Sequence, residues 1–428
     1  MEFSLVHTIS PGGTYDAQIK VNMTKGSTPS QATGSWAFTW TDDTHPAANL
    51  ELKVSNNDAD KISINAELLS IVTIGHKKGS QVEIALKDDQ WSPFILVGDE
   101  DHLAGNSPST AWMATSLDQI GCLTLQQMTI PGSHDAGMSE INFPAGGTPT
   151  NSQTQSDGIY NQLIAGIRYF DIRPTISNAH FFTGHYTGQF GANGQSIADV
   201  ISDINAYLAL PQSELIILEL SHTSMTDEQY QPFNDAQWNS LLFQLYSDLN
   251  HLYTGHGDDI LTKIPLRDFI KDGPAVVVVT NERDTNWLRD HKFLNRGFYS
   301  SKGNSNQFPT YNSYSDTNIT ETMRKDQYNK LVKQNSSPDN KDQLHVLSWT
   351  LTQDKGDIFN DAHSIRVLAN LANGHLAEVG SDIANTGPIS WATKTKPPNI
   401  ILIDNVSRDL FLVSMTLGLT RFYNKPCS

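Results

Sequence analysis

The sequence predicts a mixed α/β protein in which a closed or distorted β/α barrel follows an all-β region. Beyond about residue 115, short apolar runs that suit buried strands alternate with stretches that place apolar residues at helical spacing. The runs are almost unbroken, as expected for a parallel sheet covered by helices on both faces. The number of such units favours a barrel over an open sheet. Before about residue 105, apolar and polar residues alternate with a period of two, which predicts a β-sandwich.

The N-terminal β region is predicted from three alternating runs that turn residues separate, at residues 35–40, 50–54 and 82–86. The Gly-, Ser- and Pro-containing segment 105–110 has the composition of a linker. We therefore expect a sandwich-like domain of unknown role over residues 1–105 and a barrel over residues 115–428.

The barrel elements are expected in strict alternation. The first strand is expected over the apolar run 123–130, which ends at a Pro-Gly turn, and Ser196 with Asp199 marks a helix start. Residues 284–318 are polar and are expected to form a long surface loop that lines a cleft. The other expected strands are 215–220, 275–279, 345–349 and 400–404, and the expected helices are 197–208, 235–249, 320–334, 363–379 and 408–423.

The composition excludes some classes of partner. A net charge of −17 argues against nucleic acid and against general attraction to anionic membranes, although neutral lipid surfaces remain compatible. The two cysteines, Cys122 and Cys427, are expected as free thiols rather than as one bridge. The N-terminus lacks a signal-peptide pattern, and no apolar run approaches the ~18 residues of a spanning helix. A soluble chain is expected, either cytoplasmic or secreted with its leader removed.

Residues with acid–base potential gather in three segments. The segment Thr-Ile-Pro-Gly-Ser-His-Asp places His134 and Asp135 just beyond an expected strand end, where barrel enzymes collect catalytic groups. The segment Gly-Ile-Arg-Tyr-Phe-Asp-Ile-Arg carries Asp171 and Arg173, and Phe-Thr-Gly-His-Tyr-Thr-Gly carries His185. Two imidazoles, a guanidinium and several carboxylates suit acid–base chemistry on a phosphate ester.

Three signatures in this order resemble the X domain of phosphatidylinositol-specific phospholipase C: the first two segments above and Glu-Leu-Ile-Ile-Leu-Glu-Leu at residues 214–220. The resemblance runs from residue 123 to about 222, and more weakly to 404. It implies a distorted TIM barrel and a phosphodiesterase that cleaves a phosphatidylinositol-type glycerophospholipid at a membrane surface, through a cyclic phosphodiester. The alternatives are another phospholipid or sphingolipid headgroup, or a lipid- or glycan-binding protein without turnover.

The resemblance also assigns roles to individual residues. It makes His134 the general base, His185 the general acid and Arg173 the cation that holds two phosphate oxygens. Asp135 would orient His185, and Asp404, at a strand end near the C-terminus, would orient His134. Asp404 has an alternative reading as a cap of the final helix.

Two of the assigned residues have competitors. His180 is the alternative to His185, which we prefer because the flanking glycines, Gly184 and Gly188, would let a ligand approach. Arg168 is the alternative to Arg173, but strand alternation places these two arginines on opposite faces. Arg168 is therefore expected to form a structural ion pair.

The resemblance bears on metal and on substrate. Its metal-dependent branch has acidic residues where this chain has Arg173 and Ser221, so no cofactor is expected and Ca²⁺ is disfavoured.

Candidates for substrate binding are Asp171, Arg283 and Trp349. The basic residue and the carboxylate–tyrosine pair that read inositol in the bacterial-type branch are displaced or absent, so the headgroup stays open. Four phenylalanines near the expected mouth are candidates for lipid contact or for ordinary packing: Phe143, Phe181, Phe182 and Phe190.

Overall fold

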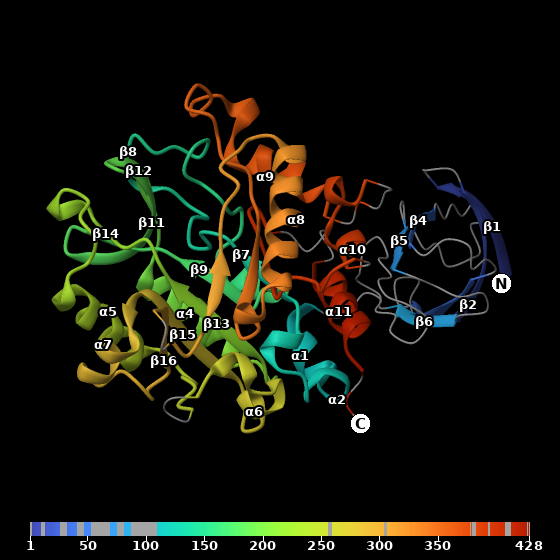
Figure 1. The fold of residues 1–428 in the computed structure, drawn as a ribbon, viewed down its shortest axis with the longest axis horizontal. Coiled ribbons are helices and arrows are strands. Elements are labelled where there is room, and N and C mark those ends of the chain that lie inside the picture. The colour runs from blue at the N-terminus through green and yellow to red at the C-terminus, as the bar shows by residue number, and fades with distance from the viewer. Residues whose placement is uncertain are drawn as a thin grey trace. The chain divides into compact units, whose positions relative to one another are not determined.

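The computed structural model describes six strands before residue 109 and, from there, residues 109–425 and 427, apart from 256–258, 304–305, 377, 379–381, 393 and 407–411. The chain divides into two compact units (Figure 1). One contains Met1–Ser107, Leu376–Pro397 and Phe411–Lys425, and the other contains Pro108–His375, Pro398–Leu410 and Pro426–Ser428.

The first unit contains the N-terminal strands. A four-stranded antiparallel sheet has the order β1-β2-β3-β6, formed by Glu2–Ile9, Gly13–Lys25, Ala32–Trp40 and Gln81–Leu86. Strands β4 (Ala47–Leu52) and β5 (Leu69–Ile74) form an antiparallel pair. The three predicted strands overlap β3, β4 and β6. The predicted sandwich packing depends on side chains that lie outside the described residues. Most of the predicted linker also lies outside them.

The second unit is built on eight parallel strands in the order β16-β15-β13-β9-β7-β19-β18-β17. They curl into a nearly closed barrel with β16 and β17 at its edges, so the predicted barrel is confirmed. All residues of β7, β13, β18 and β19 are buried, as expected for strands covered on both faces. The strands are β7 (Ile130–Ser133), β9 (Tyr169–Ile172), β13 (Leu215–Leu220), β15 (Ala275–Asp284), β16 (Phe298–Lys302), β17 (Thr310–Asn312), β18 (Leu344–Trp349) and β19 (Ile400–Ile403).

Helices connect the strands as the periodicity predicts. The Ser196 hydroxyl accepts a hydrogen bond from the Asp199 N–H at 3.0 Å and caps α4, which confirms this helix start. The expected helix over 363–379 is shorter, and the one over 408–423 is described from residue 412. The helices of the barrel unit are α1 (Trp112–Thr115), α2 (Leu117–Ile120), α3 (Ile159–Ile164), α4 (Ile197–Leu208), α5 (Asp235–Asp248), α6 (Leu266–Ile270), α7 (Thr285–Asp290), α8 (Thr320–Ser336) and α9 (Ile365–Asn373), and α10 (Pro388–Trp391) and α11 (Leu412–Tyr423) belong to the first unit.

A second sheet, which the sequence patterns did not predict, follows the carboxyl ends of the barrel strands. Its order is β14-β10-β11-β12-β8. Strand β10 begins two residues after β9 ends, and β8 and β14 follow β7 and β13. Chain continuity therefore keeps this sheet at the end of the barrel where catalytic groups are expected. Its strands are β8 (Asn142–Ala145), β10 (Pro174–Ser177), β11 (His180–Thr187), β12 (Phe190–Ser196) and β14 (Ser224–Met225).

Two predictions of local structure were wrong. The apolar run 123–130 is not the first strand, because residues 125–127 form a 3₁₀ turn and the strand begins at Ile130. The Pro-Gly pair lies inside this strand, where Pro131 still offers its carbonyl to the Arg168 N–H at 3.1 Å. The polar segment 284–318 is not a structureless loop, because it contains α7, β16 and β17.

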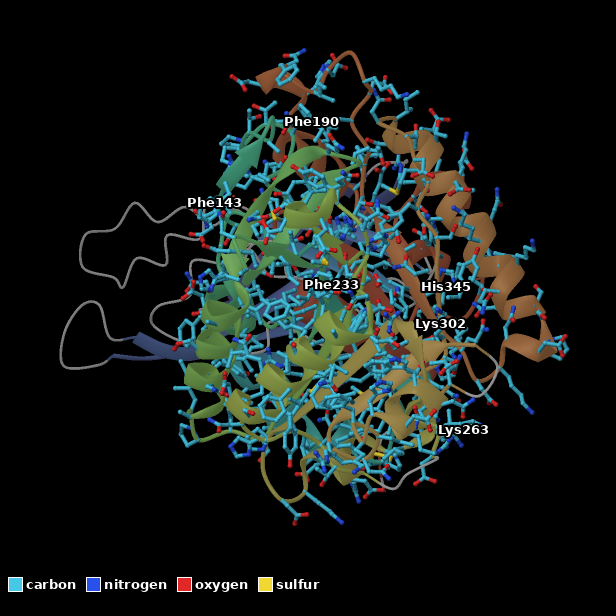
Figure 2. The ribbon with its side chains drawn as sticks, turned by 90° about the vertical axis from the view of Figure 1, so that its left-hand side faces the viewer. Phe143, Phe190, Phe233, Lys263, Lys302 and His345 are labelled. Atoms are coloured by element: carbon cyan, nitrogen blue, oxygen red, sulfur yellow. A yellow bond between two sulfur atoms is a disulfide. The ribbon has the colours of Figure 1, made fainter. Side chains whose placement is uncertain are left out.

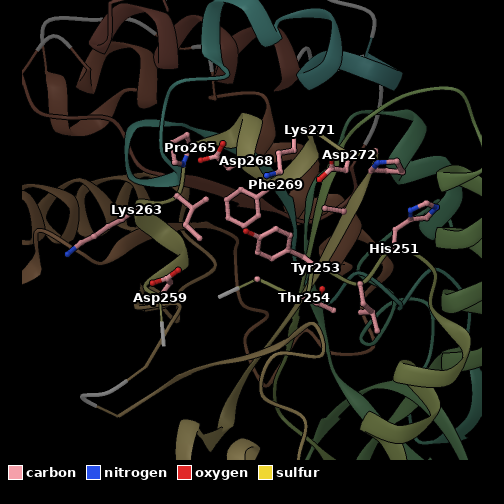
Figure 3. A pocket seen from close by; sticks show the side chains of 16 residues that line it. His251, Tyr253, Thr254, Asp259, Lys263, Pro265, Asp268, Phe269, Lys271 and Asp272 are labelled. Atoms are coloured by element: carbon pink, nitrogen blue, oxygen red, sulfur yellow. The ribbon is translucent and has the colours of Figure 1, made fainter. Parts of the chain in front are cut away.

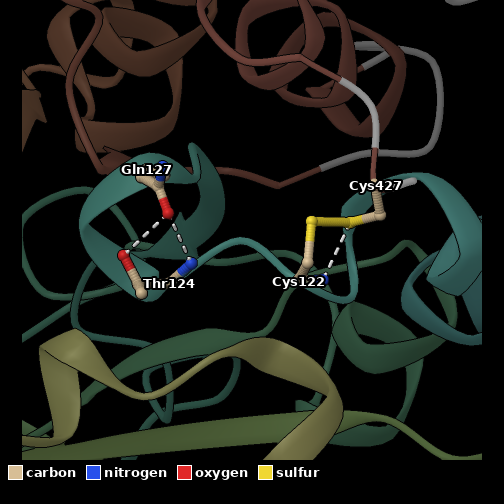
Figure 4. The surroundings of a disulfide bond; sticks show 4 residues. All are labelled: Cys122, Thr124, Gln127 and Cys427. Carbon is tan, nitrogen blue, oxygen red and sulfur yellow. Dashed lines mark hydrogen bonds between the residues drawn. A yellow bond between two sulfur atoms is a disulfide. The ribbon is translucent and has the colours of Figure 1, made fainter.

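The expectation of free thiols was also wrong. Cys122 and Cys427 form a disulfide with a Cα–Cα distance of 5.6 Å across a sequence separation of 305 residues (Figure 4). The Cys122 N–H also lies 2.9 Å from the Cys427 sulfur. Cysteine count alone did not reveal that the fold brings the C-terminal segment back to the chain before β7.

Neither a membrane span nor a metal-binding cluster is found in the part of the chain that the structure describes. No described helix has the length and apolarity needed to cross a bilayer. No group of three or more His, Cys, Asp or Glu residues among them has the geometry to hold a metal ion.

Candidate active site

The register of the barrel strands brings the predicted residues into one row. Ile403 of β19 pairs with Ser133 of β7, and Ser133 pairs with Phe170 of β9. The next residue on each strand is therefore a neighbour of the others. These residues are Asp404, His134 and Asp171, which lie at the carboxyl ends of adjacent strands, where TIM barrels build active sites.

His134 is held between a carboxylate and a guanidinium. Its Nδ1 lies 2.7 Å from Asp404 Oδ1, and its Nε2 lies 2.6 Å from Arg173 Nη2. Because arginine only donates, Nε2 must accept, and the ring proton therefore sits on Nδ1 toward Asp404. Burial alone would lower the pKa of His134, but the charge of Asp404 raises it, and the net shift is upward.

His185, on the second sheet, is also paired with a carboxylate through its Nδ1. Its Nδ1 lies 2.6 Å from Asp135 Oδ2, and its side chain is 24% exposed, compared with 10% for His134. The competitor His180 is exposed at the start of β11. Gly184 does not provide room for a ligand as we expected, because a Cβ at this position would lie 2.3 Å from the Thr175 hydroxyl. This glycine permits close packing of β11 on β10.

Arg173 links the two halves of the site. Its Nη2 lies 3.0 Å from Asp171 Oδ2, and its Nη1 lies 3.4 Å from Asp135 Oδ2. Its Nη2 also donates to the Tyr314 hydroxyl at 3.3 Å. Burial alone would raise the pKa of Asp171, but the charges of Arg173 and then His134 hold it well below its usual range. The guanidinium is therefore the central cation of an acidic cluster.

Asp135 adopts an unusual backbone conformation. Its φ is +42°, in the left-handed region that non-glycine residues rarely occupy. Its N–H donates to Asp171 Oδ2 at 3.1 Å, which helps to hold this conformation. Its second carboxylate oxygen, Oδ1, is buried and has no hydrogen-bond partner among the described residues. Strain of this kind is typical of functional sites, and the free oxygen is an acceptor for a ligand or water.

Sequence reasoning missed several contributors. Tyr314 lies in the polar segment that we expected to line a cleft, and its ring centre is 5.3 Å from that of His134. Ser221 donates its hydroxyl to Asp171 Oδ1 at 2.8 Å and lies 2.8 Å from His222 Nδ1. His222 is the second residue after the third signature, so its position just beyond a strand was a readable signal.

Glu219 is the buried carboxylate in the neighbouring strand. It pairs in register with Asp171 and accepts a hydrogen bond from the Tyr169 hydroxyl. Burial raises the pKa of Glu219 to about 7. Glu219 is thus a buried partner of Tyr169 in the strand next to Asp171.

The other two substrate-binding candidates lie apart from this row. Arg283 donates to the Phe233 carbonyl at 2.9 Å, and its guanidinium lies over the rings of Trp238 and Trp287. Trp349 is 0% exposed and donates its indole N–H to the Ala372 carbonyl at 2.8 Å. Their role as substrate contacts stays a prediction.

Arg168 forms the expected structural ion pair. Its Nε lies 2.7 Å from Glu214 Oε2, and both side chains are 0% exposed. The strand alternation that separated it from Arg173 is confirmed.

A separate hollow of about 620 Å³ lies at the amino-terminal end of β15 (Figure 3). Tyr253 and Phe269 lie within it, and Asp268, Lys271 and Asp272 contribute charges. None of the predicted site residues lines it. Because the catalytic row lies at the carboxyl ends of the strands, this hollow belongs to the other end of the barrel.

Comparison with known proteins shows what the chain is similar to. Residues 128–251 match the model of the family described as phosphatidylinositol-specific phospholipase C, X domain. The chain is 29% identical over 181 residues to 1-phosphatidylinositol phosphodiesterase of Listeria monocytogenes, a match that covers 42% of this chain and 51% of that protein. It is 27% identical over 130 residues to a PI-PLC X-box domain-containing protein of Dictyostelium discoideum, covering 27% of this chain and 17% of that protein.

Solved structures support the fold. A mutant of phosphatidylinositol-specific phospholipase C from Staphylococcus aureus superposes with a TM-score of 0.51 at 16% identity, covering 75% of this chain and 99% of that one. A second structure of this enzyme gives 0.52 at 15% identity, covering 74% and 100%. The chain spans about half or less of the length of the curated relatives it matches. Residues 128–251 are therefore similar to the phosphatidylinositol-specific phospholipase C X domain.

Proposed function

We propose that this chain is a phosphodiesterase that cleaves a phosphatidylinositol-type glycerophospholipid by histidine acid–base catalysis, without a metal. The observation that carries the proposal is the pairing of two imidazoles with two separate carboxylates on either side of one guanidinium. Neither folding nor simple binding requires two such pairs. General acid–base catalysis of phosphate-ester cleavage requires one base, one acid and a cation for the developing charge.

His134 is suited to be the base. Asp404 fixes its proton on Nδ1, which leaves the Nε2 lone pair as the proton acceptor. This lone pair accepts a hydrogen bond from Arg173 Nη2. A bound phosphate competes for the guanidinium as a bidentate partner, and its arrival would free Nε2 for the headgroup hydroxyl next to the phosphate.

His185 is suited to be the acid for the leaving alkoxide. It is more exposed than His134, so it lies closer to the route by which a diacylglycerol would depart. Asp135 on its Nδ1 stabilises the charged ring until the proton is transferred from Nε2. Attack by the neighbouring hydroxyl then breaks the bond to diacylglycerol and forms a cyclic phosphodiester, which water opens with the roles of the two histidines reversed.

Arg173 supports the proposal of metal independence. Its guanidinium lies 3.0–3.4 Å from the carboxylates of Asp171 and Asp135. It therefore occupies the place between these groups that a divalent cation would need. The positive charge that stabilises the phosphorane is then part of the chain.

The partner surface we propose is a neutral membrane surface. Two phenylalanines of the second sheet are exposed, Phe143 at 55% and Phe190 at 36% (Figure 2). Phe359, which is 67% exposed, completes this rim. The rings of Phe190 and Phe359 lie 5.9 Å apart, and Phe143 packs on Phe182 at 5.4 Å. Exposed aromatic groups near an active site favour contact with lipid.

The disulfide supports a proposal about compartment. Bridges persist in oxidising environments and are rare where thiol reductants act. Because Cys122 and Cys427 are paired, we propose that the chain works outside the reducing cytosol.

A phospholipid panel tests the proposed function. Vesicles containing phosphatidylinositol, phosphatidylglycerol, phosphatidylcholine or sphingomyelin are incubated with the chain in EDTA and, separately, in Ca²⁺. We expect phosphatidylinositol to be turned over at the same rate in EDTA and in Ca²⁺. Turnover only of another lipid supports a different headgroup, and binding without turnover supports a lipid-binding protein.

A rim variant tests the membrane contact. Phe143→Ala combined with Phe190→Ala should weaken sedimentation with phosphatidylcholine vesicles by roughly tenfold or more, because each buried phenylalanine contributes about 1.5–3 kcal/mol. Phe243→Ala removes a ring of α5 that is 62% exposed, compared with 55% for Phe143, and is the control. Equal losses in the control and the rim variant would contradict the assignment.

A further inference from the structure

His222 is a third imidazole in the active-site cluster that the acid–base scheme does not use. It is the second residue after the end of β13, and its φ of +51° places it in the left-handed region. His222 is exposed to solvent, whereas the neighbouring Ser221 is buried. The two are joined by a contact of 2.8 Å between His222 Nδ1 and Ser221 Oγ.

The direction of this hydrogen bond follows from the neighbouring carboxylate. The pKa of Asp171 is well below its usual range, so the carboxylate is ionised and only accepts. The single hydroxyl hydrogen of Ser221 is therefore committed to Asp171 Oδ1 at 2.8 Å. Ser221 Oγ must then accept from His222, which places the proton of His222 on Nδ1.

The free nitrogen of His222 is therefore an acceptor. Desolvation and then the positive charge of Arg173 lower the pKa of His222, so the ring is neutral near pH 7. With Nδ1 protonated, Nε2 carries a lone pair. None of the residues in the described ranges hydrogen-bonds to this atom, and the ring reaches solvent. Hydrogen bonds join His222 to Ser221 and Ser221 to Asp171, and an ion pair joins Asp171 to Arg173. These contacts fix the orientation of the ring and of its lone pair.

We propose that His222 is a headgroup-binding residue whose Nε2 accepts a hydrogen bond from a hydroxyl of a polyol headgroup while Arg173 holds the phosphate. This inference rests on the proposed function and names the headgroup class of the same site. A phosphate or carboxylate group only accepts, so it cannot satisfy this lone pair. A choline headgroup has no N–H or O–H to donate, so it cannot satisfy this lone pair either.

A coupling experiment tests the contact. We compare kcat/KM of the wild-type chain and of His222→Asn on phosphatidylinositol and on analogues that each lack one ring hydroxyl outside the attacking position. Asparagine tolerates the left-handed backbone but is too short to reach the headgroup. We expect His222→Asn to lower kcat/KM on phosphatidylinositol roughly 3- to 10-fold, the typical effect of one neutral hydrogen bond. The substitution should have no effect on kcat/KM for one analogue only, the one that lacks the hydroxyl that His222 contacts.

Two further variants sharpen the result. His222→Gln presents a longer amide oxygen and should recover part of the lost kcat/KM, and His180→Ala removes an exposed histidine of β11 and should change nothing. Equal losses on every analogue, or no loss on any, overturn the inference. If the wild-type chain does not turn over phosphatidylinositol at all, the proposed function fails instead.

A second measurement needs no turnover. Nitrogen–proton NMR correlation of the histidine side chains in the ligand-free chain reports which ring nitrogen carries the proton, and His222→Asn assigns the signal. We expect the Nδ1–H form for His222. Finding the proton on Nε2 would leave no acceptor and would overturn the inference.

Discussion

Replacing Asp404 with asparagine keeps the side-chain shape and removes one charge from beside the proposed base. Asp404 Oδ1 lies 2.7 Å from His134 Nδ1, and these side chains are only 3% and 10% exposed. Two unit charges about 4 Å apart attract by about 4 kcal/mol at an effective dielectric constant of about 20. The imidazolium that forms when His134 takes the proton loses this attraction, so kcat/KM should fall roughly 10³-fold.

The pH profile gives the sign of the effect. The base must be unprotonated, so the acid limb of kcat/KM follows the pKa of His134, which Asp404 raises. In Asp404→Asn this pKa falls, and the acid limb should move to lower pH while the plateau drops. The assay is phosphatidylinositol turnover between about pH 5 and 8, with thermal melting as a check of folding and the exposed Asp290→Asn as control. A loss under tenfold, or a limb that moves to higher pH, refutes the reasoning.

Three other predictions test the site and the fold. His134→Ala and His185→Ala should each lower kcat on phosphatidylinositol by ~10²–10⁴-fold with unchanged melting temperatures, and near wild-type activity in either variant contradicts its role. Arg173→Lys should lose most activity, because an ammonium cannot hold two phosphate oxygens, while the wild-type chain should keep its activity in EDTA; loss on chelation that Ca²⁺ restores contradicts metal independence. Cys122→Ser with Cys427→Ser should lower the free energy of unfolding by about 2–4 kcal/mol in a thermal melt and leave kcat unchanged, and an unshifted melting curve contradicts a stabilising bridge.

The barrel strands were predictable because their side chains are buried on both faces. An apolar run such as that of β13 has the same limits in the sequence and in the structure, from Leu215 to Leu220. The first strand was not predictable in this way. Four residues that include proline and glycine form it, and its place in the sheet comes from pairing with β19 and β9 rather than from local preference.

The catalytic residues were predictable where they belong to signature segments, and less so where the fold brings distant segments together. His134 and Arg173 follow strands whose register sets their distance. His185 lies on the second sheet, which the sequence patterns did not predict. Tyr314, which contacts Arg173, belongs to a polar segment that was expected at the surface. The disulfide of Cys122 depends on where the fold places Cys427, which the local sequence does not indicate.

Phosphorus NMR of the first product tests the central claim most directly. The claim is that His134 activates a hydroxyl of the substrate itself and that His185 protonates the departing diacylglycerol. Phosphatidylinositol in mixed vesicles, turned over in ¹⁸O-labelled water, should show the cyclic inositol phosphodiester before any acyclic monoester, with no label in the cyclic species. An acyclic monoester from the outset, with ¹⁸O incorporated in the first step, would contradict the account.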